Sequence, residues 1–516
     1  MPFTKLSTSS LNRVAVVVLV SAAAAMGSAS ADERGVPSVI STRNASGVLR
    51  TFAPTGIDTD NPFFKSLGTT GTTCEHCHFA SDAWGLSAAH ARALFEDTDG
   101  THPLFSPHAA NDPKQAALLT PDSPIEDRNR LYGLLLDKGD VLVRLALRLP
   151  SDPEAPAEFT LVGADDPSLP DHGKVEVPGV GLVGDPAAYL AYTGGQLWLH
   201  RRPLPTTNFG FLTAVLWDGR NTPNPSPIVA PVRAGVVKVA RDTIVSREAP
   251  VPGQYTDAEL DELAAAMAAF QFSLFTAQAI DRRAGPLDAQ GATGGPQNLS
   301  REYFFFGIND VLGDNPSHQS FSPLIFDLYD GWAHTPGKAF REARAAVVRG
   351  QQLFNSKPLH ISGVGGLNGA TITLSDGVTQ IAGPGPFTGT CGSCHDAPNV
   401  GNHSTRLPIN IGVSDEAPVA AGRAAVEDLP LFTLRNNSTG EIIRTTDPGR
   451  ATRTGKWAHV GEFKGPILHG LAARAPYFHN GMAATLGDVV NFYDVRFGAE
   501  FTEREKADLV AFLKTL

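Results

Sequence analysis

The chain has 516 residues, with 53 acidic against 42 basic side chains, which gives a formal net charge of −11. Nucleic acids and anionic membranes bind basic patches, so this balance argues against both as partners. The length exceeds what one hydrophobic core organises and predicts two or three domains. Fifty-one glycines and 39 prolines predict much loop.

Residues 1–31 have the three parts of a secretory signal peptide. Lys5 and Arg13 precede an apolar run over 14–26, and Ala29-Ser30-Ala31 forms a small-residue cleavage site. The run is shorter than the roughly 20 residues that span a bilayer. We therefore expect a protein exported to the bacterial periplasm or secreted, with no membrane attachment after cleavage. An uncleaved anchor is the alternative.

All four cysteines lie in two Cys-x-x-Cys-His motifs, Cys74-Glu75-His76-Cys77-His78 and Cys391-Gly392-Ser393-Cys394-His395. This string attaches c-type haem, because two thiols bind one porphyrin covalently and the histidine binds its iron. A zinc site needs two such pairs roughly 15–20 residues apart, and a disulfide leaves both histidines unexplained. The motifs predict two covalent haem c groups, with His78 and His395 as iron ligands.

Periodic patterns predict the elements between the two motifs. An amphipathic pattern indicates a helix over 82–96. Short alternating runs at 141–149, 158–162 and 174–177 indicate strands among proline, glycine and aspartate. We interpret about 103–204 as a β- and loop-rich insertion in the first haem domain.

Two capping boxes predict later helices. Thr256-Asp257-Ala258-Glu259 begins a helix that the apolar pattern extends to about 283, and Thr502-Glu503-Arg504-Glu505 begins the last one. The glycine-rich stretch 285–295 is the expected domain boundary. We predict a mainly α fold with two cytochrome c-like haem domains, 32–285 and 296–516, and much irregular structure.

Three further motifs make the chain recognisable. They are Trp217-Asp218-Gly219-Arg220, Phe463-Lys464-Gly465-Pro466-Ile467-Leu468 and Ala475-Pro476-Tyr477-Phe478-His479-Asn480-Gly481. Together with the two haem motifs in this order, they resemble the bacterial di-haem cytochrome c peroxidase/MauG superfamily over about 56–516. The rubber oxygenase RoxA belongs to the same superfamily and is similarly enlarged, so membership alone does not fix the reaction.

The resemblance implies different roles for the two haems. The N-terminal haem, on His78, would bind peroxide or dioxygen, and the C-terminal haem, on His395, would transfer electrons. Its second axial ligand would be Tyr493, fourteen residues after His479, where peroxidases have methionine and MauG has tyrosine. A phenolate favours ferric iron, unlike a thioether. The alternatives are a half-buried structural Tyr493 and Met482 as the ligand.

The family motifs also supply candidate electron- and proton-transfer residues. Trp217 would relay electrons between the haems. The alternative is that Trp217 packs in the core, as tryptophan usually does. Arg220 would pair with a haem propionate, or hold Asp218 in a turn. His479 would relay protons, or be a satisfied structural histidine. The loop histidines His403 and His469 receive no role.

This chain has no acidic residue at the position where the family's peroxidases have their distal glutamate. Their glutamate follows the Trp-Asp-Gly-Arg motif, and the corresponding positions here are Val236-Val237-Lys238-Val239. Peroxide activation needs a group that moves a proton between the oxygens. Asp242 and Glu248 are the nearest acids, and both are also consistent with solvated surface charges. A dioxygen-binding pocket without an acid is therefore an open alternative.

A calcium ion between the haems is a further implication of the resemblance. The Asn111 side chain and the backbone oxygens of Arg474 and Pro476 would be its ligands, completed by waters. Asn111 is otherwise an ordinary turn residue.

These observations predict an exported di-haem c-type oxidoreductase that uses hydrogen peroxide and passes oxidising equivalents through Trp217. Its expected partners are a redox protein or organic electron donor, and homodimers are common among such proteins. The alternatives are a RoxA-like oxygenase that uses dioxygen and a non-catalytic electron carrier.

Overall fold

The computed structural model describes residues 37–152, 156–222, 230–334, 339–374, 376 and 378–516. The predicted signal peptide lies outside these residues. Within them, no helix combines the length and apolar character needed to cross a bilayer.

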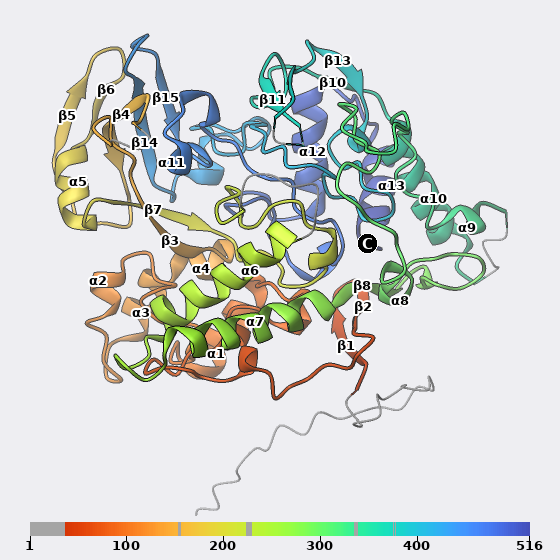
Figure 1. Cartoon of the computed structure of the whole chain (residues 1–516), viewed down its shortest axis with the longest axis horizontal. Coiled ribbons are helices and arrows are strands. Elements are labelled where there is room, and N and C mark those ends of the chain that lie inside the picture. Colours follow the sequence, from red (N-terminus) through yellow and green to blue (C-terminus); the bar gives the residue numbers. More distant parts are fainter. Residues whose placement is uncertain (1–36, 153–155, 223–229, 335–338, 375, 377) are drawn as a thin grey trace, which may run out of the picture.

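The first half combines an antiparallel sheet with helices. The sheet has the order β1-β2-β8-β9, with β1 Val39–Asn44, β2 Gly47–Phe52, β8 Phe275–Asp281 and β9 Gly285–Pro286. The main helices are α1 Ala88–Thr98, α6 Ala230–Thr243 and α7 Asp257–Ser273. Figure 1 shows α6 and α7 running beside each other. Side chains from both helices enclose a core around the buried Trp84.

Two helices of this half differ in extent from the sequence prediction. The capping box of α7 is present, since the Thr256 amide donates to Glu259 Oε2 at 2.7 Å. The helix ends at Ser273, well before the predicted end near 283, because the following residues complete the sheet as β8 beside β2. α1 begins at Ala88 after the N-cap Ser87, six residues later than predicted.

The predicted insertion contains the strands that the sequence indicated. They are β3 Val141–Ala146, β4 Phe159–Asp165 and β5 Lys174–Val177, joined by β6 Gly181–Gly184 and β7 Gln196–Arg201. β3 pairs with β7 and β5 pairs with β6. The short helices of this segment are α2 Pro113–Ala116, α3 Ile125–Leu131, α4 Gly133–Lys138 and α5 Pro186–Thr193.

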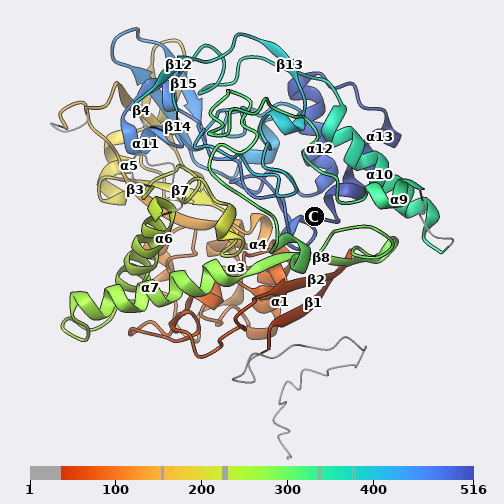
Figure 2. The same ribbon diagram turned by 45° about the vertical axis from the view of Figure 1, so that its right-hand side comes forward.

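The insertion is joined to the second half of the chain by a shared sheet. β4 pairs with β14, Leu431–Asn436, which in turn pairs with β15, Ile442–Thr445. Both figures show these blue strands beside the yellow strands of the insertion (Figures 1 and 2). The pairing buries Phe159 and Phe432 in one core. The domain boundary at 285–295 stays a prediction. The sheet of β4, β14 and β15 joins the two halves of the chain through residues distant from that boundary in the sequence.

The second half is organised by three helices around the second haem motif. α10 Arg341–Ser356 packs against α13 Glu503–Leu513, and α12 Leu486–Phe497 lies beside α13. Gly350 permits the close crossing of α10 and α13, since a Cβ there would lie 2.1 Å from the Asp508 carbonyl oxygen. The other elements are α8 Pro296–Leu299, α9 Asp330–His334, α11 Ala451–Thr454, β10 Leu359–Ile361, β11 Thr371–Thr373, β12 Gln380–Ala382 and β13 Phe387–Gly389.

The predicted mainly α fold class is wrong. Helices make up 32% of the structure and strands 18%, spread over several sheets. The sequence prediction confined strands to the insertion, whereas the N-terminal sheet and the pairs β10–β13, β11–β12 and β14–β15 lie outside it. These strands are short and flanked by turn residues, so they leave little periodic signal.

Candidate haem-attachment and redox site

Both haem motifs adopt the same local structure. Each forms a 3-10 turn, at Cys74–His76 and at Cys391–Ser393. The threonine before each turn donates its amide to a side chain three residues on, Thr73 to His76 Nδ1 at 3.0 Å and Thr390 to Ser393 Oγ at 3.1 Å. This bond closes the turn in both motifs.

Each proximal histidine is oriented by a backbone carbonyl. His78 Nδ1 lies 3.1 Å from the Trp84 oxygen, and His395 Nδ1 lies 2.8 Å from the Gly401 oxygen. An Nδ1–H donated to a carbonyl leaves Nε2 as the lone-pair nitrogen that a metal needs. Desolvation lowers the pKa of both imidazoles, that of His78 to about 4, which keeps them in the ligating neutral form.

The second motif opens onto an apolar cavity. Protein atoms leave about 1700 Å³ of space there, part of it open to solvent. Its walls include Cys391, Cys394, His395, Trp217 and Tyr493. The cavity fits a large apolar ring, because the two thiols and the imidazole share it with predominantly aliphatic and aromatic side chains.

Tyr493 projects from α12 into the cavity of the second motif. Its ring stacks on Phe497 with centroids 6.0 Å apart. Burial raises the pKa of its hydroxyl, and nearby Cys394 and Cys391 raise it further. The phenol is therefore close to the haem-attachment cysteines, and it needs a cation such as iron to ionise.

Buried cations also line the cavity. Arg202 donates through Nη1 to the Arg474 carbonyl at 2.6 Å, and Lys464 donates to the Ala214 carbonyl at 3.1 Å. Burial lowers the pKa of Lys464 to about 7 and that of Arg202 to about 10. The Nε atoms of Arg202 and Arg474 are buried without a hydrogen-bond partner. Anionic carboxylates such as haem propionates would complete these donors.

Trp217 and His479 form one aromatic group on this cavity. Trp217 Nε1 donates to the Arg202 carbonyl at 2.8 Å, and its ring lies 6.2 Å from that of His479. His479 stacks on Phe463 at 3.9 Å. Burial lowers the pKa of His479 to about 4, and both of its ring nitrogens are buried without a hydrogen-bond partner. A neutral imidazole in this state can accept a proton or hydrogen bond from a cavity occupant.

Arg202 also connects this group to the first motif. Its Nη2 donates to the Leu86 carbonyl, two residues beyond the Trp84 carbonyl that orients His78. Its backbone amide donates to the His479 carbonyl at 2.7 Å. One residue thus contacts the surroundings of both haem motifs, and the sequence prediction did not include it.

Arg220 lies in a buried ion network. Its Nη1 donates to Asp218 Oδ2 at 2.5 Å, and Arg201 Nη1 donates to the same oxygen at 2.7 Å. Arg201 also forms a bidentate pair with Asp447 at 2.6 and 2.9 Å. Asp218 is fully buried, so Arg220 does not merely close a surface turn. The predicted pairing of Arg220 with a propionate stays a prediction.

The two candidate acids have different surroundings. Asp242 pairs with Lys238 at 2.6 Å, and both side chains are about half exposed. Glu248 is 1% exposed and ends a π-helical turn, Ile244–Glu248, that continues α6. Its Oε2 accepts from the Leu67 amide at 2.7 Å, whereas Oε1 is buried without a partner. π-helical turns occur frequently at functional sites.

Glu248 lies near the first motif and has a raised pKa. Burial raises the pKa of Glu248 to about 7. Burial also raises the pKa of Cys74, and the charge of Glu248 raises it further. A pKa near the working pH suits a general acid or base. Val236 and Val237, which the spacing from the Trp-Asp-Gly-Arg motif placed where the family's peroxidases have their distal acid, pack among apolar side chains.

Replacing Glu248 by glutamine is expected to change how stability depends on pH. A carboxyl whose pKa is raised from 4.5 to about 7 on folding stabilises the protein at low pH, and this stability is lost as pH rises from 4.5 through 7. Glutamine keeps an acceptor for the Leu67 amide but does not ionise. The free energy of unfolding, measured in urea, should therefore rise for E248Q relative to wild type as the pH increases from 5 to 8.

The matched control is E259Q, which removes an exposed carboxylate whose pKa is lowered by hydrogen bonds from Thr256. The difference in free energy of unfolding between E259Q and wild type should stay constant over that pH range. A constant difference for E248Q as well would contradict the raised pKa of Glu248.

The predicted calcium ligands are engaged by protein donors. Asn111 Oδ1 accepts from the Leu134 amide at 3.2 Å, and Asn111 Nδ2 donates to the Arg130 carbonyl at 3.3 Å. The Arg474 carbonyl accepts from Arg202. Pro476 lines the cavity of the second motif. A calcium ion would have to share these oxygens with those donors, and the calcium site remains a prediction.

Comparisons with known proteins identify relatives of part of the chain. The cytochrome c peroxidase IdrP2 of Denitromonas iodatirespirans is 32% identical over 145 residues, which are 25% of this chain and 37% of the relative. IdrP1 of the same organism is 36% identical over 152 residues, 25% of this chain and 38% of the relative. The cytochrome c551 peroxidase of Nitrosomonas europaea is 42% identical over 69 residues, 13% and 21% of the two chains.

The similarity covers less than two thirds of each of these relatives. No family model matches the chain. Among solved structures, a MauG-like protein associated with microbial copper homeostasis is similar at 16% identity and a TM-score of 0.30, over 62% of this chain and 76% of that one. The chain thus has two haem-attachment motifs, and parts of it are similar to cytochrome c peroxidases, which supports the resemblance to the di-haem cytochrome c peroxidase/MauG superfamily.

Proposed function

We propose that this protein is an exported di-haem c-type oxidoreductase that uses hydrogen peroxide to oxidise a redox protein or an organic donor. The observation that carries the proposal is the cavity of the second motif, in which Cys391, Cys394 and His395 face Tyr493 and Trp217. When bound, haem c supplies an iron that can hold the oxidising equivalents of peroxide.

The residues around the two haem motifs would have different roles. Near the first motif, His78 would hold iron and Glu248 would move a proton, because its pKa lies near 7 and one of its oxygens has no partner. At the second motif, His395 and Tyr493 would hold the iron. Arg202, Lys464 and Arg474 would neutralise the carboxylates of the porphyrin.

Trp217 would carry oxidising equivalents toward the second motif. Indole is the most easily oxidised of the common aromatic side chains, and this one lies on the cavity wall with its Nε1–H held by the Arg202 carbonyl. Beside it, the neutral imidazole of His479 has one lone-pair nitrogen, and neither of its ring nitrogens has a hydrogen-bond partner, so it could accept a proton or hydrogen bond from an occupant of the cavity.

Replacing Trp217 by phenylalanine is expected to slow peroxide-dependent oxidation of an electron donor at least tenfold, which corresponds to about 1.4 kcal/mol of activation free energy. Phenylalanine keeps the packing but is much harder to oxidise. The haem content and the KM for peroxide should stay unchanged. Steady-state turnover with reduced cytochrome c or a dye donor measures the effect.

Trp457→Phe is the matched control, because Trp457 donates to Glu441 at 3.2 Å and does not line the cavity of the second motif. Its turnover should equal that of wild type. Equal turnover of W217F and W457F would exclude Trp217 as the relay.

The apolar surroundings of Val236 and Val237 support a second candidate, an oxygenase that binds dioxygen without a distal acid. That function predicts a stable ferrous–dioxygen complex and an E248Q variant with unchanged activity. The proposed peroxide function predicts that E248Q loses about 10²-fold or more of its turnover, the usual contribution of a general acid–base group.

A further inference from the structure

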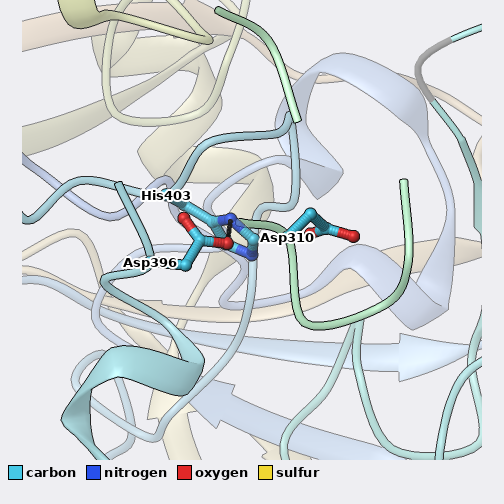
Figure 3. A group of neighbouring side chains, drawn as sticks. All are labelled: Asp310, Asp396 and His403. Carbon is cyan, nitrogen blue, oxygen red and sulfur yellow. Dashed lines mark ion pairs between the residues drawn. The ribbon is translucent and has the colours of Figure 1, made fainter. Parts of the chain in front are cut away.

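A second group of buried titratable side chains lies behind the second haem motif. Asp310, Asp396 and His403 are 1%, 0% and 4% exposed. One potential ligand atom of each lies within 4.8 Å of the others. Figure 3 shows the imidazole of His403 between the two aspartates, which come from separate loops. The haem and peroxide chemistry proposed above uses none of the three.

Backbone amides hold one oxygen of each carboxyl group. Asp310 Oδ2 accepts from the amides of Leu312 and Asp314 at 3.0 and 2.8 Å. Asp396 Oδ1 accepts from the Ser404 amide at 2.5 Å. The remaining oxygens are Asp396 Oδ2, 3.1 Å from His403 Nδ1, and Asp310 Oδ1, which accepts a long bond of 3.4 Å from Thr405. These oxygens are therefore positioned but weakly satisfied.

The charge of the group is not balanced by the protein. When both carboxyl groups are ionised, two carboxylates and one imidazolium sum to −1, and burial opposes this state by raising the pKa of Asp310. Among the described residues, no lysine or arginine forms an ion pair with Asp310 or Asp396, whose ion-pair partner is His403 alone. Buried charges in proteins are paired or bind a metal. A cation between these side chains would compensate the charge that the protein leaves.

Two further polar atoms of the same loop lack partners. His403 Nε2 and Ser404 Oγ are buried and make no hydrogen bond, in residues that are 4% and 0% exposed. A buried polar atom without a partner costs about 1–3 kcal/mol. His403 also lines the cavity of the second motif, so its Nε2 is available to an occupant of that cavity. Asp396 Oδ2 likewise has no hydrogen-bond partner, and as part of the group itself it indicates a missing ligand there.

We propose that Asp310, Asp396 and His403 bind one divalent metal ion, and that this ion is zinc. A nitrogen donor with two carboxylate oxygens suits zinc, whereas calcium and magnesium prefer oxygen ligands alone. Zinc bonds of about 2.0–2.2 Å place neighbouring ligand atoms roughly 3–3.5 Å apart, which matches the 3.1 Å between His403 Nδ1 and Asp396 Oδ2. The Ser404 hydroxyl or a water completes a tetrahedral site.

The ion would fasten the loop of Asp310 to the segment that carries the second haem. Asp396 directly follows His395, and Ser404 and Thr405 adjoin His403. Its role would be structural, because all three side chains are buried, and the ion would lie beside the cavity of the second motif, which His403 also lines.

The test is metal analysis of the haem-loaded protein. Wild type is stripped with a chelator, dialysed against zinc chloride and analysed for zinc and iron together. The expected result is one zinc for every two irons, with a melting temperature that rises with zinc concentration. Failure of wild type to take up zinc would overturn the proposal.

Substitutions locate the ion. Asp310→Asn keeps acceptors for the Leu312 and Asp314 amides, and His403→Gln keeps a polar side chain, yet each should lower zinc affinity at least tenfold. The matched control is His90→Gln, which breaks another His–Asp pair, with Asp82 at 3.2 Å, that belongs to no such three-residue group among the described residues. H90Q should bind zinc as wild type does. If D310N and H403Q take up as much zinc as H90Q, the ion binds elsewhere and the assignment is contradicted.

Discussion

Replacing Arg201 by alanine is expected to destabilise the protein by about 3–5 kcal/mol, the usual cost of removing one partner from a buried ion pair. Arg201 is 2% exposed and is the cation shared by Asp218 and Asp447. Without it, Asp447 loses both bonds to the guanidinium and Asp218 keeps only Arg220. Urea unfolding at pH 7 measures the loss.

The effect of R201A should depend on pH with a defined sign. Burial raises the pKa of Asp218, but Arg201 and Arg220 outweigh it and hold that pKa below its usual value. The stability from this pairing is therefore present at neutral pH and is lost as pH falls through the usual aspartate range near 4. The difference between wild type and R201A should shrink in acid.

An exposed ion pair serves as the control for R201A. Arg241 lies on α6 and pairs with Asp257 and Asp261, whose side chains are 92% and 65% exposed. Arg241→Ala should cost less than about 1 kcal/mol, as exposed pairs usually do. Similar losses for R201A and R241A would contradict the importance of the buried network.

Replacing Tyr493 by phenylalanine is expected to abolish the six-coordinate absorption spectrum of one haem and leave that of the other unchanged. Tyr493 lines the cavity of His395 and is the proposed second ligand of that iron. Tyr493→Met should restore six-coordination and raise the reduction potential on the order of 100 mV, because a thioether favours ferrous iron. Absorption spectra and potentiometric titration measure both effects.

Tyr477→Phe is the control, since Tyr477 lines the same cavity but donates its hydroxyl to the Leu471 carbonyl at 2.9 Å. Its spectrum should match that of wild type. A Y493F protein with an unaltered spectrum would show that another residue is the ligand.

The haem-attachment residues were predictable because their signal is local. Five consecutive residues fix the position of two thiols and an imidazole, and the structure gives both copies the same turn. The capping boxes at Thr256 and Thr502 are also local, and both helices begin where they predict. Short-range hydrogen bonds of this kind depend little on the rest of the fold.

Features that depend on distant segments were not predictable. The helix predicted to reach 283 ends at Ser273, because pairing with β2 decides the conformation of the next residues. β4 pairs with β14 across more than 250 residues, and neither strand carries a pattern that names its partner. The mainly α prediction failed for this reason.

The same distinction applies to the candidate site. Arg202 acts through contacts with Leu86 and Arg474, which are far from it in sequence, so no motif revealed it. His403 was visible as a loop histidine next to a haem motif, but only folding brings Asp310 beside it. Asp242 and Glu248 were indistinguishable in the sequence, and burial separates them.

The most direct test of the proposed function is rapid mixing of the oxidised di-haem protein with hydrogen peroxide while the absorption spectrum is recorded. The proposal predicts a fast loss of the high-spin band of the haem on His78, and W217F should alter the changes that follow while W457F should not. An unchanged spectrum in wild type would contradict peroxide activation, and dioxygen binding by the reduced protein would then separate an oxygenase from an electron carrier.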